Sequence, residues 1–151
     1  MYSTRQLQKL RFRLGAALAP NDWESFMASL RQEYLESLDE KIAVVERYEG
    51  LDFSLEEISN FFHKLKGSGA TYGFNAISEM GETLEDYFKS LLESASDPNL
   101  RAKNLDIDEL TRATQHLHEA RLFLSSIKTF YAKNPLSETF PTAWKSGKNN
   151  E

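Results

Sequence analysis

The sequence predicts an all-α protein: an antiparallel four-helix bundle with one additional helix at its N-terminus. Apolar residues recur at intervals of three and four along most of the chain, which is the period of an amphipathic helix. No segment shows the polar and apolar alternation of a half-buried strand. Short segments with Pro, Gly or Asn separate the periodic stretches, so consecutive helices are expected to pack antiparallel.

The chain divides into three regions. Its 151 residues suit one domain, and we expect a bundle over residues 21–133, a basic extension over 1–20 and a partly flexible tail over 134–151. The extension holds four cationic residues and no acidic one. Leucines at helical spacing (Leu7, Leu10, Leu14 and Leu18) favour an amphipathic helix over 4–19 rather than a signal or transit peptide.

The first bundle helix is expected to begin at Asn21 or Asp22, after Pro20 ends the basic helix, and to run to about residue 48. Gly50 then provides a C-terminal stop. The apolar face of this helix steps by three or four residues through Trp23, Phe26, Leu30, Tyr34, Leu38, Ile42, Val45 and Tyr48.

The second helix has a strong start signal. Ser54 and Glu57 fit a capping box, and Phe53 and Ile58 occupy the flanking staple positions. The helix is expected to end at about Ala70. A turn over residues 71–73 follows, and Asn75 can cap a third helix. The core face of that third helix comprises Ile77, Met80, Leu84, Tyr87, Phe88 and Leu91.

The fourth helix is expected to open at Asp106, which has a box-like spacing to Glu109, and to stop at Asn134. Its core face comprises Ile107, Leu110, Ala113, Leu117, Ala120, Leu124, Ile127 and Tyr131. In the tail, Phe140 and Trp144 are expected to anchor on the bundle through apolar contacts.

Composition excludes several classes of function. The chain has no cysteine, which removes disulfides and thiolate chemistry and is consistent with a cytoplasmic protein. A net charge of −5 disfavours nucleic-acid binding, and no apolar run is long enough to span a bilayer. His116 and His118 lie on roughly opposite sides of a helix, so we expect no metal site.

A helical wheel places one histidine on the outer face of the second helix. With His63 at zero and about 100° per residue, the apolar residues fall between roughly 160° and 280°. These residues are Leu55, Ile58, Phe61, Phe62 and Leu65. His63 lies nearly opposite the centre of that arc, so its ring is expected to face solvent. Ser59, Lys66, Gly67 and Ala70 lie within about 60° of it and form its predicted surroundings.

These residue types suit transfer of a phosphoryl group. Imidazole has an ordinary pKa near 6.5, so a nucleophilic neutral form is abundant at neutral pH. Lys66 lies one turn from His63 and can offset the charge of phosphoryl oxygens. Gly67 costs roughly 1 kcal/mol in a helix interior relative to alanine, and its expected benefit is close approach of another protein.

The segment from His63 to Phe74 closely resembles the signature of the histidine-containing phosphotransfer (HPt) family. That pattern is His-x-x-Lys-Gly-Ser, then small residues, then Gly-Phe before the next helix. Ile77 and the pair Leu84 and Glu85 in the third helix also match it. The resemblance implies phosphorylation of His63, a phosphoryl-stabilising Lys66, and docking of a receiver domain on Gly67, with Ser68 at the family's small position. The wheel adds Ser59 and Ala70 as further docking residues.

The resemblance also implies a route for the phosphoryl group. His63 is expected to accept it from a receiver domain or a hybrid histidine kinase, and to pass it to the aspartate of a response-regulator receiver domain. The receiver is expected to bring magnesium, so this chain needs no cofactor. We expect a cytoplasmic monomer that is a phosphoryl carrier and not an enzyme, without nucleic-acid or membrane partners.

Two alternative functions stay open and a third is disfavoured. The chain can be a non-catalytic bundle that binds or sequesters a receiver domain, or a phosphotransfer fragment of a chemotaxis-type kinase. A dimeric histidine kinase is disfavoured, because its motif has an acidic residue after the histidine and a proline shortly downstream. Here Lys64 follows His63 and the next proline is Pro98. No glycine-rich ATP-binding segment is present either.

Overall fold

A computed structural model describes residues 3–15, 20–50, 53–95, 97–135 and 140–144, without the side chains of residues 10–15, 20 and 21. These residues form helices and no β-strand. The helices are α1 (Thr4–Gly15), α2 (Pro20–Glu36), α3 (Leu38–Tyr48), α4 (Leu55–Thr71), α5 (Asn75–Ala95), the 3-10 helix η1 (Ala102–Asn104) and α6 (Ile107–Lys133). The predicted all-α class is therefore confirmed.

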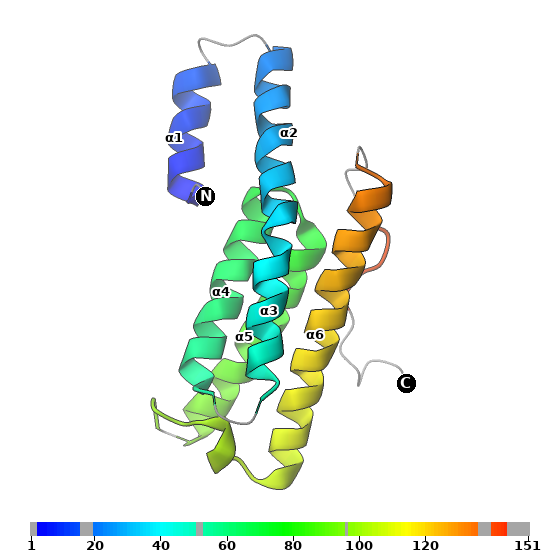
Figure 1. Cartoon of the computed structure of the whole chain (residues 1–151). Coiled ribbons are helices and arrows are strands. Elements are labelled where there is room, and N and C mark those ends of the chain that lie inside the picture. Colours follow the sequence, from blue (N-terminus) through cyan, green and yellow to red (C-terminus); the bar gives the residue numbers. More distant parts are fainter. Residues whose placement is uncertain (1–2, 16–19, 51–52, 96, 136–139, 145–151) are drawn as a thin grey trace.

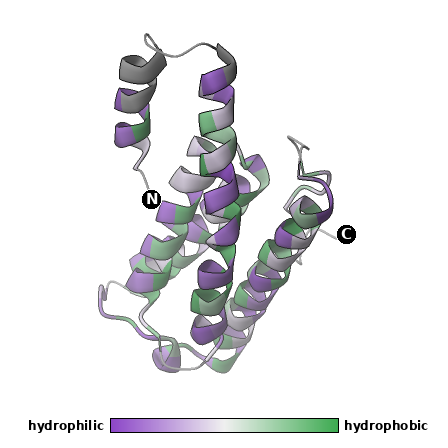
Figure 2. Cartoon of the chain, turned by 45° about the horizontal axis from the view of Figure 1, so that its top comes forward, coloured by the Kyte–Doolittle hydropathy of each residue, from purple (hydrophilic) through white to green (hydrophobic). Residues whose placement is uncertain are grey.

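Helices α3, α4, α5 and α6 form the bundle (Figure 1). Helix α2 continues the line of α3 beyond the bundle, and α1 lies beside α2 at that end. The bundle helices carry hydrophobic residues along one side and hydrophilic residues along the other (Figure 2). The apolar sides meet in a core that includes Tyr34, Leu38, Phe62, Phe88 and Leu124, each fully buried.

The closest helix pair in the bundle is α4 and α5, and two glycines permit this approach. A Cβ atom at Gly81 in α5 would lie 2.7 Å from the backbone nitrogen of Lys66 in α4. A Cβ atom at Gly69 would lie 2.8 Å from the backbone nitrogen of Ser78. Both distances are far shorter than real Cβ contacts, so any larger residue would force the two helices apart.

The predicted starts of two helices are confirmed. The Ser54 hydroxyl accepts a hydrogen bond from the Glu57 backbone N–H at 3.4 Å, and α4 begins after it. Asp106 accepts one from the Glu109 N–H at 2.8 Å, and α6 begins after it. Each cap satisfies a backbone donor that the first helical turn leaves without a partner.

The predicted long first helix is interrupted, because α2 ends at Glu36 and α3 begins at Leu38. Ser37 between them keeps helical backbone angles, and its hydroxyl donates to the Tyr34 carbonyl at 2.6 Å. Such a local bond competes with the regular backbone ladder. Helix α2 also starts at Pro20, earlier than predicted; proline is well tolerated in the first turn because it lacks an N–H.

Two smaller predictions are wrong. Ile107 was expected in the core but is exposed, because it is the first residue of α6 and points away from the bundle. Asn75 was expected to cap α5 but is its first helical residue. The Phe74 carbonyl accepts the first helical bonds there, from the backbone N–H groups of Ile77 and Ser78.

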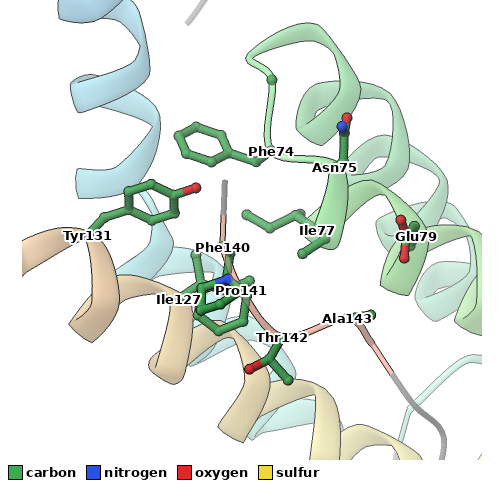
Figure 3. A pocket seen from close by; sticks show the side chains of 12 residues that line it. Phe74, Asn75, Ile77, Glu79, Ile127, Tyr131, Phe140, Pro141, Thr142 and Ala143 are labelled. Carbon is green, nitrogen blue, oxygen red and sulfur yellow. The ribbon is translucent and has the colours of Figure 1, made fainter. Parts of the chain in front are cut away.

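The predicted anchoring of the tail is confirmed. Phe140 packs edge-on against Phe123 and Phe130 of α6, and the ring of Trp144 lies 5.1 Å from that of Phe123. Residues 140–143 close one side of a cavity of about 250 Å³, with Phe74 and Ile77 opposite (Figure 3). None of the described helices is both long and apolar enough to cross a bilayer.

Candidate functional site

The candidate site centres on His63, which lies near the middle of α4. Its side chain is 67% exposed, so the predicted solvent-facing position is confirmed. Two turns of regular helix precede it and two follow it, and Phe62 and Leu65 on the opposite face are buried in the core. The core therefore fixes the backbone beneath an accessible ring.

A buried carboxylate on the neighbouring helix holds one edge of this ring. The Nδ1 atom of His63 lies 2.8 Å from Oε2 of Glu85 in α5, and the Glu85 side chain is only 4% exposed. The Lys89 ammonium group contacts the same oxygen at 2.9 Å from one turn further along α5. Two donors from the surface thus meet one acceptor at the edge of the core.

The protonation state of Glu85 follows from these contacts. Burial raises the pKa of the Glu85 carboxyl group, but the hydrogen bonds from Lys89 and His63 together outweigh burial and lower the pKa below its ordinary value. Glu85 is therefore ionised at neutral pH and can only accept hydrogen bonds. We infer that Nδ1 of neutral His63 carries the proton, which leaves the Nε2 lone pair available on the exposed side.

Lys66 lies on the same face as His63, as predicted. Its ammonium group pairs with the Glu82 carboxylate of α5 at 3.3 Å. Both partners are substantially exposed, and such pairs contribute about 0–1 kcal/mol. The ammonium group can therefore leave Glu82 at little cost when an anion arrives on His63.

The outer surface next to His63 is open. Gly67 and Ala70 are exposed, and a Cβ atom built on Gly67 would have no neighbour within 4 Å. Packing within this chain therefore does not require glycine at position 67, in contrast to Gly69 and Gly81. The predicted outward position of Gly67 is confirmed. We call the exposed surface of His63, Gly67 and Ala70 the docking face.

The prediction that Ser59 is exposed is wrong. The helical wheel placed it on the exposed face, but it retains only 3% exposure. On the wheel it lies on the same flank as Phe62 and Lys66, where Gly81 lets α5 approach the α4 backbone. Helix α5 therefore covers this short side chain. Direct docking of a partner on Ser59 is ruled out in this conformation.

Ser68 also points away from the docking face. Its hydroxyl lies 2.7 Å from the hydroxyl of Tyr34 in α2 and donates to the Leu65 carbonyl at 3.3 Å. Burial is the largest influence on Tyr34 and raises the pKa of its hydroxyl to about 12. Ser68 thus connects α4 to α2, and its side chain is positioned to support the site and not to contact a partner.

Sequence reasoning missed the role of Glu85. The residue was noted only for its resemblance to the family pattern, without a contact to His63. A signal was available: Gly81, Glu85 and Lys89 recur every four residues along the border of the apolar face of α5. Only the close approach of α5 to α4, however, shows that Glu85 reaches His63.

The other two histidines lie elsewhere. His116 packs edge-on against Tyr87, with ring centroids 4.5 Å apart, and His118 contacts Glu49 of the α3 end. Within the described ranges, no group of three or more His, Asp or Glu residues could hold a metal ion.

The site is thus an exposed imidazole, oriented by a buried carboxylate, on a helix of an all-α bundle. The model of the Hpt domain family matches residues 29–121, which is more than half of the chain, and this protein belongs to that family. The match includes all the candidate site residues and excludes α1. Neither the comparison with curated proteins nor the comparison with solved structures finds a match. Hpt domains are phosphoryl-carrier modules of phosphorelays, and not kinases.

Proposed function

We propose that His63 carries the phosphoryl group between receiver domains of a two-component phosphorelay. The observation that supports this most strongly is the pairing of His63 with Glu85, which leaves Nε2 exposed while Nδ1 is held. A phosphoryl carrier needs a nucleophile that a partner's active site can reach, and the exposed ring beside Gly67 meets that need.

In the proposed step, the Nε2 lone pair attacks the phosphorus of an aspartyl phosphate on the receiver domain. An N–P bond forms as the bond between phosphorus and the aspartate oxygen breaks, and the aspartate leaves as a carboxylate. The imidazole ring gains positive charge because Nδ1 keeps its proton. The ionised Glu85 stabilises that charge through the 2.8 Å hydrogen bond.

Lys66 has a proposed role on the phosphoryl side of the ring. Its ammonium group is held on Glu82 by a weak exposed pair, one helical turn from His63. When phosphoryl oxygens arrive, they offer a stronger negative charge than Glu82. Lys66 then offsets part of that charge, and the receiver domain supplies the aspartate and the magnesium ion.

The direction of transfer follows the partner that is phosphorylated, so the same site serves donors (a receiver domain or a hybrid histidine kinase) and acceptors (a response regulator). We propose that the protein acts as a monomer in the cytoplasm, where it shares a compartment with receiver domains. The absence of cysteine supports a reducing compartment.

The test is phosphotransfer from a panel of phosphorylated receiver domains to wild-type protein and to the His63→Gln variant. We expect acid-labile, base-stable label on the wild-type chain and none on the variant. Glutamine keeps the size and polarity of the side chain but has no nucleophilic nitrogen. Label on His63→Gln would contradict the proposal.

A binding assay separates the proposal from the sequestration alternative. A bundle that only binds receiver domains would retain receiver binding in His63→Gln and take no label in the wild type. A fragment of a chemotaxis-type kinase would take label from ATP only when the remaining kinase domains are supplied. The proposed carrier takes label from a phosphorylated receiver domain without added ATP.

A further inference from the structure

The charges of this protein are unevenly distributed along the chain. Residues 1–21 contain four cations and no acidic residue, and residues 58–78, which include His63, contain two cations and no acidic residue. The chain as a whole has 18 cations and 23 acidic residues, so the remaining segments hold 12 cations and all 23 acids, a net charge of −11. The two segments without acidic residues therefore carry net positive charge, whereas the rest of the chain is strongly acidic.

The structure brings these two segments together. The hydroxyls of Thr4 in α1 and Thr71 at the end of α4 lie 2.5 Å apart. The Thr71 hydroxyl donates its only hydrogen to the Gly67 carbonyl at 2.9 Å, so Thr4 is the donor in the bond between the two threonines. Leu7, one turn along α1, is buried. Two consecutive hydrogen bonds thus connect Thr4 of α1 to the backbone of Gly67 in the docking face.

Two cations lie on the exposed side of α1, among the side chains that the structure describes. Arg5 and Lys9 are both exposed and flank the buried Leu7. Figure 1 shows that α1 begins near the end of α4 and extends from there beside α2. Arg5 follows Thr4, which contacts Thr71, so Arg5 lies near the end of α4 next to the docking face, and Lys9 lies one turn further along α1.

We propose that Arg5 and Lys9 of α1 extend the docking face and bind an acidic surface of the receiver domain. This inference rests on the proposed function and names the chemistry of the partner's surface. The α1 helix lies outside the matched family region, 29–121, so it is an addition by which this chain selects among receiver domains.

A typical protein–protein interface is wide enough for a receiver domain docked on His63 to extend to α1. Eight residues separate His63 from Thr71, or about 12 Å along the helix at 1.5 Å per residue. An interface of about 800 Å² per partner corresponds to a disc of roughly 16 Å radius, and one of about 600 Å² to roughly 14 Å. A receiver domain centred on His63 therefore extends past Thr71 to the start of α1, where Arg5 lies. Lys9 is about one turn further along α1 and acts on it across a distance of the order of the Debye length, about 8–10 Å.

The two cations are expected to act through long-range electrostatic attraction of the partner. The acidic remainder of the chain repels an acidic partner, whereas the exposed cations of α1 attract it, so the partner is oriented before contact. Rim charges act mainly on the association rate, and salt screens them over about 8–10 Å. The inference therefore predicts a change in association rate and in its salt dependence.

The test uses the receiver domain that transfers most rapidly to the wild-type protein. Its association rate is measured over a range of NaCl concentrations for wild type, Arg5→Gln/Lys9→Gln and Lys103→Gln. Glutamine has a helix propensity close to that of lysine and arginine, so α1 is retained. Lys103 is an exposed cation of η1, which lies at the opposite end of the bundle, and serves as the matched control.

We expect the double variant to associate roughly two- to fivefold more slowly per removed charge at low salt, which is the range of exposed charge pairs. We also expect its salt dependence to be weaker, whereas Lys103→Gln behaves as wild type. Equal rates and salt dependence for the double variant and wild type would overturn the inference. Failure of the proposed function would instead appear as unlabelled His63 in the wild type.

Anionic lipid is the competing partner for a basic helix. Sedimentation with phosphatidylcholine vesicles, with and without phosphatidylserine, tests this reading on the same variants. Binding that requires phosphatidylserine, Arg5 and Lys9, together with unchanged receiver association in the double variant, would overturn the inference in favour of a membrane surface. No binding to either vesicle, with slowed receiver association, would support it.

Discussion

His63 and His118 make the same contact in two regions of the bundle, and both side chains are exposed, but their surroundings differ. Each Nδ1 atom lies within hydrogen-bond distance of a glutamate from another part of the chain: Glu85 of α5 at 2.8 Å for His63, and Glu49 just after α3 at 3.0 Å for His118. Each histidine also has a cation three residues later, Lys66 or Arg121. A carboxylate partner and a nearby cation therefore do not by themselves distinguish the two histidines.

The neighbours of the two rings differ. Arg121 binds Glu49, and its guanidinium group also lies 3.0 Å from Nδ1 of His118. That nitrogen thus faces a donor and an acceptor together, so neither tautomer is clearly favoured. Four residues after His118 stands Leu122, which is 49% exposed, whereas Gly67 stands four residues after His63. The ring of His63 thus has one favoured tautomer and a glycine beside it, whereas the ring of His118 has competing contacts at Nδ1 and an exposed leucine beside it.

Among the variants that compare the two regions, the largest effect is expected on receiver binding. It should follow when Gly67 is replaced by leucine, the residue that stands at the corresponding position beside His118. Gly67→Leu should weaken receiver binding by about thirtyfold, which corresponds to about 2 kcal/mol for a side chain that obstructs the centre of an interface. The free energy of unfolding should stay equal or rise by up to about 1 kcal/mol, because Gly67 has no neighbours and glycine is a poor helix former.

Receiver titration and denaturant unfolding measure these two quantities. Leu122→Ala is the matched control, since it changes the corresponding position beside His118. Unchanged receiver affinity in Gly67→Leu would show that the partner does not approach this part of α4.

A smaller effect, on the transfer rate, is expected when the Glu85 carboxylate is replaced. Glu85→Gln keeps the shape of the side chain but removes the charge that stabilises the phosphorylated ring, so the transfer rate should fall by roughly tenfold. Receiver affinity should stay near the wild-type value, because Glu85 is buried beneath the ring. Rapid-quench kinetics at saturating receiver domain separates the two effects.

The corresponding variant beside His118, Glu49→Gln, should leave the transfer rate unchanged. Burial raises the pKa of Glu49, but its contacts with Arg121 and His118 outweigh burial and lower it, as at Glu85. Both glutamates are thus charged at neutral pH. Equal losses in the two variants would mean that transfer depends on bundle stability and not on the ring.

The smallest effect is expected at Lys66. Lys66→Ala should slow transfer severalfold without abolishing it, because the lysine adds only one exposed positive charge to the site. Arg121→Ala provides the comparison, and it should not change transfer. A Lys66→Ala rate identical to that of wild type would remove this lysine from the mechanism.

The sequence predicted several features that depend on one helix alone. The caps at Ser54 and Asp106 depend on short-range spacing, and the outward position of His63 depends on the pattern of α4 itself. Such features follow from helix geometry without knowledge of the neighbours. Transfer through His63 itself stays a prediction until it is measured.

Features that depend on two helices were missed. Ser59 was placed on the outer face because a wheel contains one helix, but the glycine at position 81 of α5 lets that helix cover it. The contact of Glu85 with His63 depends on the same approach. The interruption at Ser37 is a separate, local case: its hydroxyl donates to the Tyr34 carbonyl, and the periodic pattern of apolar residues across it does not show this bond.

The most direct test of the account is to identify the phosphorylated nitrogen by NMR of the ¹⁵N-histidine-labelled protein after transfer from a receiver domain. The account predicts a single phosphohistidine, at Nε2 of His63, with Nδ1 still protonated toward Glu85. Phosphorylation at Nδ1 of His63, or on His118, would contradict the claim that a held Nδ1 and an open surface define the site.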